Sequence, residues 1–353
     1  MSDGRIPVAI LGATGNVGQR FIQLLENHPW FRVAELVASE RSAGRRFSEA
    51  TDWRLGSTMP GVASDLTVLD YDADLQSPLV FSGLPGEVAG EIEERLASSG
   101  HAVLSNTSTH RMEPDVPLLI PEVNADHVAA IAQQRQNRGW KGYIVTNANC
   151  SAIHLTLALK PLHDAFGLDA VLVTTMQAVS GAGYPGVPSL DMIDNVVPYI
   201  GGEEEKLETE SQKMLGRWSA EGGFAPAEFI LSAHCNRVAV RDGHMEAVSV
   251  RFRQPATPPE VIAVFESFRA KPQELGLPSA PAQPIIVRRE NNRPQPIFDR
   301  DAERGMASIV GRVRECPLLG TKFVVLGHNT IRGAAGASIL NAELFKVEGL
   351  LPS

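Results

Sequence analysis

The chain has little cysteine and no cysteine pattern. Its three cysteines, Cys150, Cys235 and Cys316, are too few and too widely spaced for a disulfide scaffold or a metal cluster. We therefore expect free thiols in a reducing compartment, one of them reactive, and no metal site.

Positive charge and long apolar runs are lacking as well. The 41 acidic residues outnumber the 32 basic ones, and the formal net charge of -9 provides no basic field for a phosphate backbone. No apolar run reaches the ~18 residues of a membrane helix, and glycines interrupt the first apolar strand before it could serve as a signal segment. We expect a cytoplasmic protein that binds neither nucleic acid nor membrane.

The 353 residues favour two domains, because one domain typically takes about 150 residues. In the first half, short β-branched runs alternate with helical stretches, which predicts a parallel sheet flanked by helices. A helix is expected from Gly15 to about Asn27. The expected strands are Val8 to Leu11, Val33 to Ala38, LTVLDY, PLVFSG, HAVLSN and YIVTNA.

The second half has a different pattern. SAIHLTLALKPLHDAFG predicts a helix and VLVTTMQAVS a strand, while FILSAHCNRVAV and HMEAVSVRF flank RDG and predict an antiparallel pair with a tight turn. The Pro-rich stretch 255–296 predicts loops and one helix, and NTIRGAAGASILNAEL a helix that returns to the first domain. We expect an α/β protein: a Rossmann-like nucleotide-binding domain (1–149 and 329–353) and an α+β domain with a mixed or antiparallel sheet (150–328).

A glycine-rich turn directly follows the first strand. In VAILGATGNVG, the missing side chains of Gly12, Gly15 and Gly18 let backbone N–H groups approach a pyrophosphate at the start of a helix. The spacing differs from the commoner G-x-G-x-x-G. Its place at the first strand-to-helix junction nevertheless favours a dinucleotide site over a plain tight turn.

The segment after the second strand bears on the choice between NAD and NADP. It reads LVASERSAGRR, in which Ser39, Arg41 and Ser42 offer donors and a cation to a 2′-phosphate. NADP is favoured, provided that Glu40 points away. The alternative is a charged surface loop that faces water.

Cys150 lies in TNANCSAIH, between a strand and a helix. Unpaired N–H groups at the first turn of a helix stabilise a thiolate and the oxyanion formed by its attack, which suits covalent catalysis. The alternative is a small buried cysteine. A thiol nucleophile also needs a base, and His244, in a loop after RDG, is favoured over His234 and His328.

Six segments together resemble the aspartate-semialdehyde dehydrogenases, in particular the branch typical of archaea and fungi. They span essentially the whole chain: GATGNVGQ, NANCS, MQAVSGAGYPGV, IGGEEEKLETE, CNRVAVRDGH and GHNTIRGAAGASILNAEL. The resemblance implies NADPH-dependent conversion of 4-aspartyl phosphate to aspartate 4-semialdehyde through a thioacyl enzyme. Cys150 would be the nucleophile and His244 the general acid/base. It also implies a homodimer or homotetramer built through the second, catalytic domain.

The resemblance further assigns substrate residues. Arg237 would bind the substrate carboxylate, Gln177 would orient the substrate, and Asn149 would act beside the nucleophile. Glu203 would meet the amino group, whereas Lys206 and Arg111 would bind phosphate. The expected cofactor residues are Gly12, Thr14, Gly15, Asn16, Val17, Gly18, Ser39, Arg41, Ser42, Ser82, Gly181 and Asn329, the last of which would position the nicotinamide.

The match has small departures, because Ala148, Ala239 and Thr107 stand where the family commonly has other residues. None removes a reacting group. Three alternatives stay open: a related acyl reductase such as malonyl-CoA reductase, an N-acetyl-glutamyl-phosphate reductase, and an inactive NADP-binding protein that keeps the fold.

Overall fold

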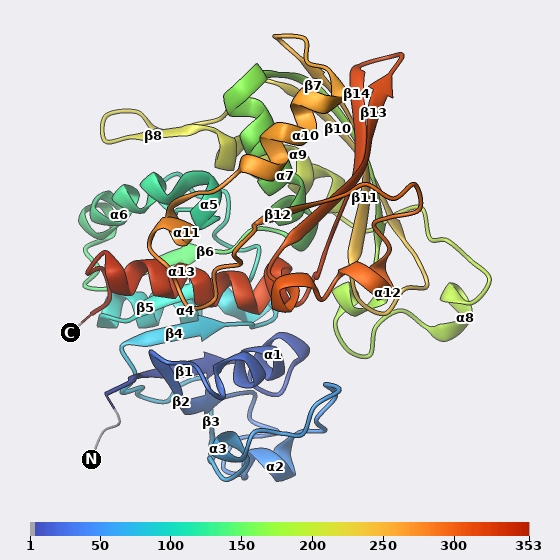
Figure 1. Ribbon diagram of the computed structural model, residues 1–353. Coiled ribbons are helices and arrows are strands. Elements are labelled where there is room, and N and C mark those ends of the chain that lie inside the picture. Colours follow the sequence, from blue (N-terminus) through green and yellow to red (C-terminus); the bar gives the residue numbers. More distant parts are fainter. Residues whose placement is uncertain (1–3, 353) are drawn as a thin grey trace.

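The computed structural model describes residues 4–352, which form two six-stranded sheets and a small hairpin (Figure 1). The first sheet is parallel, with the order β3-β2-β1-β4-β5-β6. Chain direction across the sheet reverses between β1 and β4, the switch point at which such sheets bind dinucleotides. Its strands are β1 (Ile6–Leu11), β2 (Phe31–Val37), β3 (Val68–Leu69), β4 (Leu79–Ser82), β5 (Ala102–Ser105) and β6 (Tyr143–Thr146).

Both faces of this sheet are buried, because alternate residues of β1 enter different cores. Val8 and Ile10 pack with α1 and α13, whereas Ala9 and Leu11 pack with α4. In Figure 1 the C-terminal α13 lies beside β5, so the end of the chain returns to the first sheet as expected. The helices of this half are α1 (Asn16–Leu25), α2 (Phe47–Ala50), α3 (Gly61–Ser64), α4 (Gly86–Ser99), α5 (Pro121–Asn124), α6 (Ala130–Arg138) and α13 (Gly336–Val347).

The second sheet is mixed, with the order β10-β7-β11-β14-β13-β12. Only the pairs β10–β7 and β12–β13 are parallel. Its strands are β7 (Leu168–Gln177), β10 (Ile230–Arg237), β11 (His244–Phe252), β12 (Ile285–Arg288), β13 (Ser308–Cys316) and β14 (Gly320–Gly327), and β8 (Arg217–Ser219) with β9 (Gly223–Ala225) forms the hairpin.

Helices cover one face of the second sheet and leave much of the other exposed. Residues of β10 alternate between exposed and buried, and the buried set packs with α7 and α9. Leu118 and Ile120 join this core although they precede β6 in the chain. The helices of this half of the chain are α7 (Cys150–Phe166), α8 (Ser189–Met192), α9 (Glu203–Leu215), α10 (Pro258–Ser267), α11 (Lys271–Glu274) and α12 (Pro296–Asp299).

The predicted pairing of β10 with β11 is wrong, because β7 lies between them. The connection 238–243 is longer than the tight turn that RDG suggested, and it crosses the end of β7. There, the Val179 and Ser180 N–H groups donate to the carbonyl oxygens of Val240 and Arg241 at 2.8 and 3.2 Å. This crossing places His244 near the end of the strand that carries Gln177.

Three smaller expectations also differ from the structure. LTVLDY contributes only the two residues of β3, β7 ends at Gln177 rather than Ser180, and the Pro-rich stretch contains the strand β12 besides helices. The C-terminal helix begins with a π-helical segment, Ile331–Ala335. Across residues 4–352, no helix has the length and apolar character needed to cross a bilayer.

Candidate active site

A cleft of about 460 Å³ opens between the start of α1 and the start of α7. It brings together residues that lie far apart in the sequence. The sequence-predicted residues that line it are Asn16, Val17, Arg111, Asn149, Cys150, Gln177, Gly181, Glu203, Lys206, Arg237 and Asn329.

Cys150 is the first residue of α7, and Asn149 caps that helix. The Asn149 Oδ1 atom accepts hydrogen bonds from the N–H groups of Ser151 and Ala152, at 2.9 and 3.3 Å. Both donors therefore already have an acceptor, although the Ser151 N–H also interacts with the Cys150 thiol in the direction that favours the thiolate. Burial raises the pKa of the Cys150 thiol to about 12, with Glu203 adding to the effect. The thiol is neutral near pH 7.

Glu203, at the start of α9, links several of the predicted residues. Its Oε2 atom accepts from Asn149 Nδ2 at 2.8 Å and from Gln177 Nε2 at 3.3 Å. Its Oε1 atom accepts from Lys206 Nζ at 3.0 Å. One buried carboxylate thus orients two amides beside Cys150 and holds a cation one helical turn away.

His244 is fully buried at the start of β11 and lies behind Gly181. Its Nδ1 atom accepts from the Ala178 N–H at 3.0 Å, so the neutral ring carries its proton on Nε2. Burial, followed by Arg237, holds the pKa of His244 well below its usual range. A Cβ atom on Gly181 would lie 2.9 Å from Arg237 Nη1 and 3.1 Å from His244 Nε2, so glycine lets the chain pass close to both.

The other two histidine candidates lie elsewhere. His234 is on the uncovered face of the second sheet, with 82% of its side chain exposed. His328 is buried, and its pKa falls to about 4, mainly because of that burial and of Arg20. Neither lines the cleft. His244 does not line it either, but its Nε2 atom lies directly behind Gly181, which does, and this favours His244 as the proton carrier.

The glycine turn after β1 fits a pyrophosphate. Gly12 has φ +71°, and a Cβ atom there would lie 2.6 Å from the carbonyl oxygen of Gly83. A Cβ atom on Gly18 would lie 2.3 Å from the Gly12 oxygen. Helix α1 has no side-chain cap and no acidic residue in its first turn, so its N–H groups and its dipole favour an anion.

The remaining expected cofactor residues differ in their exposure and in their hydrogen bonds. Ser39 and Ser42 form one turn, in which the Ser42 N–H donates to the Ser39 oxygen at 2.8 Å, and Arg41 is exposed beside them. Ser82 is fully buried at the end of β4, so neither its side chain nor its backbone is exposed in the cleft. Asn329 joins two loops: its Oδ1 accepts from the Gly243 N–H at 2.8 Å, and its Nδ2 donates to Ser180 Oγ at 2.9 Å.

Two family descriptions match this chain. "Semialdehyde dehydrogenase, NAD binding domain" matches residues 7–131, and "Semialdehyde dehydrogenase, dimerisation domain" matches residues 159–332. The aspartate-semialdehyde dehydrogenase of Archaeoglobus fulgidus is 51% identical over 348 residues, covering 98% of this chain and 100% of its own. The chain belongs to the semialdehyde dehydrogenase family. The aspartate-semialdehyde dehydrogenase of Schizosaccharomyces pombe is also similar. It is 47% identical to this chain, and the match covers 98% of this chain and 99% of the yeast enzyme.

A solved structure supports the same assignment of the chain to this family. The aspartate semialdehyde dehydrogenase of Candida albicans, determined with NADP, superposes with a TM-score of 0.91 at 43% identity. The match covers 98% of this semialdehyde dehydrogenase and 100% of the fungal chain.

Sequence reasoning missed Asn106 and Glu210 in this semialdehyde dehydrogenase. The Arg111 guanidinium donates from Nη1 to Glu210 Oε1 at 3.0 Å and from Nη2 to the backbone carbonyl oxygen of Asn106 at 2.8 Å. A signal for Glu210 was present, because it follows Glu203 by two helical turns in EEEKLETE and so shares its face of α9.

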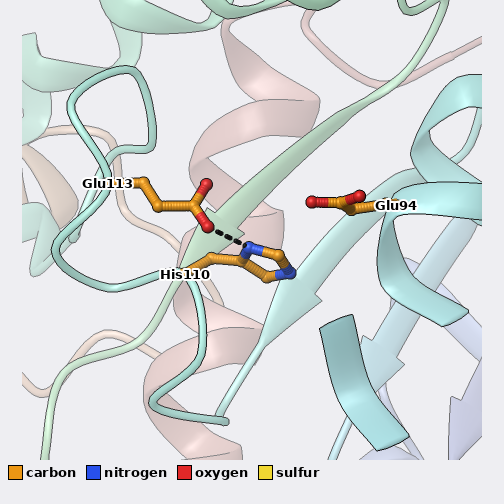
Figure 2. A group of neighbouring side chains, drawn as sticks. All are labelled: Glu94, His110 and Glu113. Carbon is orange, nitrogen blue, oxygen red and sulfur yellow. Dashed lines mark hydrogen bonds and ion pairs between the residues drawn. The ribbon is translucent and has the colours of Figure 1, made fainter. Parts of the chain in front are cut away.

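One further group of side chains could hold a metal ion in principle. The carboxylates of Glu94 and Glu113 flank the imidazole of His110, with ligand atoms within 4.8 Å of one another (Figure 2). However, His110 Nδ1 bonds to Glu113 at 2.7 Å, and the Arg138 guanidinium pairs with both glutamates. The Arg138 guanidinium thus already supplies a positive charge beside these carboxylates. We therefore interpret Glu94, His110 and Glu113 as part of an ion-pair network.

Proposed function

We propose that this chain is an NADP-dependent aspartate-semialdehyde dehydrogenase. It converts 4-aspartyl phosphate reversibly to aspartate 4-semialdehyde and phosphate, a step in the biosynthesis of lysine, threonine and methionine. The observation that carries the proposal is the convergence of Cys150, Gln177, Glu203 and Arg237 on one cleft beside the glycine turn. The full-length similarity to enzymes of that name supports the choice of substrate.

The charges of the cleft match an amino-acid acyl phosphate. The Arg237 guanidinium, which donates to the Ala178 oxygen at 2.9 Å, is suited to the substrate carboxylate, and the Glu203 carboxylate to its ammonium group. Arg111 and Lys206 supply positive charge for the phosphate. A thioester of coenzyme A has no phosphate bonded to its acyl carbon, so this second pair of cations fits an acyl phosphate better.

Cys150 acts as the nucleophile. Its sulfur attacks the acyl carbon, the C–O bond to phosphate breaks, and a thioacyl enzyme forms. Because the thiol starts neutral, its proton must leave as the bond forms. The nearby Arg111 and Arg237 both favour the thiolate and so oppose the effects of burial and of Glu203.

His244 moves protons at its Nε2 atom. In the arrangement seen here Nε2 carries a hydrogen, which suits donation to the oxygen as the thiohemiacetal forms, or to the sulfur as the thiohemiacetal collapses to aldehyde. To accept a proton at the same nitrogen, the neutral ring must first adopt the other tautomer. That tautomer carries its hydrogen on Nδ1, so the contact with the Ala178 N–H has to open.

The cofactor is NADP, which when bound supplies the hydride that reduces the thioacyl group. The turn of Gly12, Thr14, Gly15, Asn16, Val17 and Gly18 would hold the pyrophosphate, and Ser39, Arg41 and Ser42 would hold the 2′-phosphate. Asn329 and Gly181 border the nicotinamide end of the cleft. Asn16, Val17 and Cys150 line one continuous space, which is what transfer between cofactor and thioacyl carbon requires.

The protein forms oligomers through its dimerisation domain. We assign the subunit contact of a homodimer to the uncovered face of the second sheet, where Leu172 and Ile230 are 47% and 67% exposed. Ile193 and Tyr199, in the segment between β7 and α9, are exposed apolar side chains as well. A homotetramer would pair two such dimers.

We assign residues 1–149 and 329–353 to the NADP-binding domain and 150–328 to the catalytic and dimerisation domain. The packing of α13 on the first sheet supports this division. The three free cysteines support a cytoplasmic location.

Steady-state assays of the purified protein test the function. We expect NADPH oxidation with 4-aspartyl phosphate, little with NADH, and none with malonyl-CoA or N-acetyl-glutamyl phosphate. Activity with malonyl-CoA alone would replace the proposal by the thioester reductase. A folded protein that binds NADP and reduces none of these substrates would indicate an inactive relative.

A further inference from the structure

Helix α9 continues past the cleft with two more buried charged residues. Glu203 and Lys206 border the cleft, and Glu210 and Lys213 follow on the same face of the helix. Glu210 is 1% exposed and Lys213 is 4% exposed. Because burying a charge costs free energy unless it is paired, the partners of these two residues show what the helix holds in place.

The two oxygens of Glu210 bind two different segments. Oε1 accepts from Arg111 Nη1 at 3.0 Å, and Oε2 accepts from the backbone N–H of Asn149 at 2.6 Å. Asn149 is the cap of α7 and directly precedes Cys150. One carboxylate therefore joins the arginine of the anion site to the cysteine loop.

Lys213 holds the backbone of the same arginine. Its Nζ atom donates to the carbonyl oxygens of Arg111, Glu113 and Val116 at 2.7, 2.9 and 2.9 Å. The main chain of this loop is thus tied to α9 by Lys213, and the Arg111 side chain by Glu210. The loop follows β5 of the first sheet, so a helix that packs on the second sheet sets the place of its cation.

The Arg111 guanidinium keeps donors for an anion in this arrangement. It has five N–H donors, of which Glu210 and the Asn106 oxygen take one each. Its Nε atom is buried without a hydrogen-bond partner among the described residues. A planar donor group held by two partners keeps its orientation, so its remaining N–H groups point in fixed directions, and Arg111 lines the cleft.

We propose that Glu210 is a positioning residue of this site, which orients Arg111 toward the phosphate of the substrate and fixes that cation relative to Cys150. The inference deepens the proposed function and rests on it for the identity of the anion. A carboxylate that merely neutralised Arg111 would weaken anion binding. A carboxylate that orients the guanidinium strengthens it.

The test compares Glu210→Gln and Glu210→Asp with wild type in calorimetric titrations with inorganic phosphate. Both variants are expected to raise the phosphate Kd by ~10-fold or more, the usual effect of losing a hydrogen bond to a charged group. Glu210→Asp keeps the charge but loses reach, so it separates orientation from neutralisation and also serves if Glu210→Gln does not fold. Glu205→Gln makes the same charge change on the exposed side of α9 and is expected to leave the Kd unchanged.

A double-mutant cycle identifies the route of the effect. Arg111→Gln is expected to weaken phosphate binding, and adding Glu210→Gln to it is expected to change the Kd by less than ~2-fold, because the two residues act as one unit. In the assay that oxidises the aldehyde, Glu210→Gln should raise the KM for phosphate and leave the KM for the aldehyde within ~2-fold. A purely structural residue would instead lower the folded fraction and leave both KM values unchanged.

Equal or tighter phosphate binding by both Glu210 variants, additive effects in the cycle, or a wild-type protein that does not bind phosphate would overturn the inference. The titrations need neither aldehyde nor NADP. A wild type that binds phosphate but does not reduce 4-aspartyl phosphate would therefore refute the proposed function alone.

Discussion

Gly333 lies so close to Cys150 that a Cβ atom on Gly333 would stand 2.9 Å from the cysteine Cβ and 3.2 Å from its Cα. Gly333 belongs to the π-helical segment Ile331–Ala335, which packs against both α1 and α7. Through Gly333 the segment therefore packs directly on the backbone of the nucleophile. Only a residue without a side chain permits that approach.

Gly333→Ala should therefore move the cysteine and slow the reaction. A displacement of about 1 Å can cost about 10²-fold in rate, so we expect kcat for NADPH-dependent reduction to fall by that order. Gly86→Ala is the matched control, because a Cβ atom at Gly86 meets nothing within 4 Å. Equal rates for the two variants would show that the loop accommodates the methyl group.

Cys150 should react with alkylating agents in a strongly pH-dependent way. The thiolate is the nucleophile, and with a pKa near 12 its fraction rises about tenfold for each pH unit below that value. We expect the rate of iodoacetamide labelling at Cys150, followed by peptide mass spectrometry, to climb steadily from pH 7 to pH 10. A plateau near pH 8 would indicate a thiolate stabilised by its surroundings.

Local sequence signals predicted the parts of this fold that local physics decides. The glycine turn after β1 and the helix after Cys150 follow from backbone freedom and residue pattern. The same signals failed at RDG, where the pattern of a tight turn says nothing about β7, a strand some 60 residues earlier that is inserted between β10 and β11. Such an insertion is decided by the packing of the whole sheet.

The site was predicted unevenly for the same reason. Motif positions placed Gln177, Glu203 and Arg237 in the cleft with Cys150. They did not show that Asn149 takes the first-turn N–H groups of α7, or that the Ser82 side chain faces the core. Those outcomes depend on side-chain directions, which spacing along the chain does not contain.

Replacement of His244 by glutamine should remove proton transfer while keeping a side chain of similar size. General acid–base catalysis typically contributes 10²- to 10⁴-fold, and we expect a loss of about that size in kcat. His101→Gln is the control, because His101 precedes β5 and lies at the end of the first sheet away from the cleft. A His244→Gln enzyme within a few-fold of wild type would require another proton carrier.

Glu246 offers a test of stability against pH. It lies two residues after His244 on the same side of β11, is fully buried, and has no partner for either carboxylate oxygen among residues 4–352. Burial raises the pKa of Glu246 well above its usual range, so the folded protein keeps the proton where the unfolded chain has lost it. Its contribution to stability is therefore complete below the unfolded pKa of about 4.3 and declines as pH rises, until it levels off above the folded pKa.

Glu246→Gln should remove this decline, because the amide has a similar shape and does not ionise. In urea unfolding between pH 5 and pH 9, the free energy of unfolding of the variant is expected to gain on that of wild type as pH increases, by up to ~1.4 kcal/mol per pH unit below the folded pKa. The direction of the change in the free energy of unfolding with pH separates this effect from that of the buried histidines. The pKa of His154 falls to about 3, mainly through burial, so His154 destabilises the fold as pH drops below about 6.5. If the free energies of unfolding of wild type and Glu246→Gln changed in parallel with pH, Glu246 would have the same pKa in the folded and unfolded chains. Water would then have to reach its carboxylate in the folded protein.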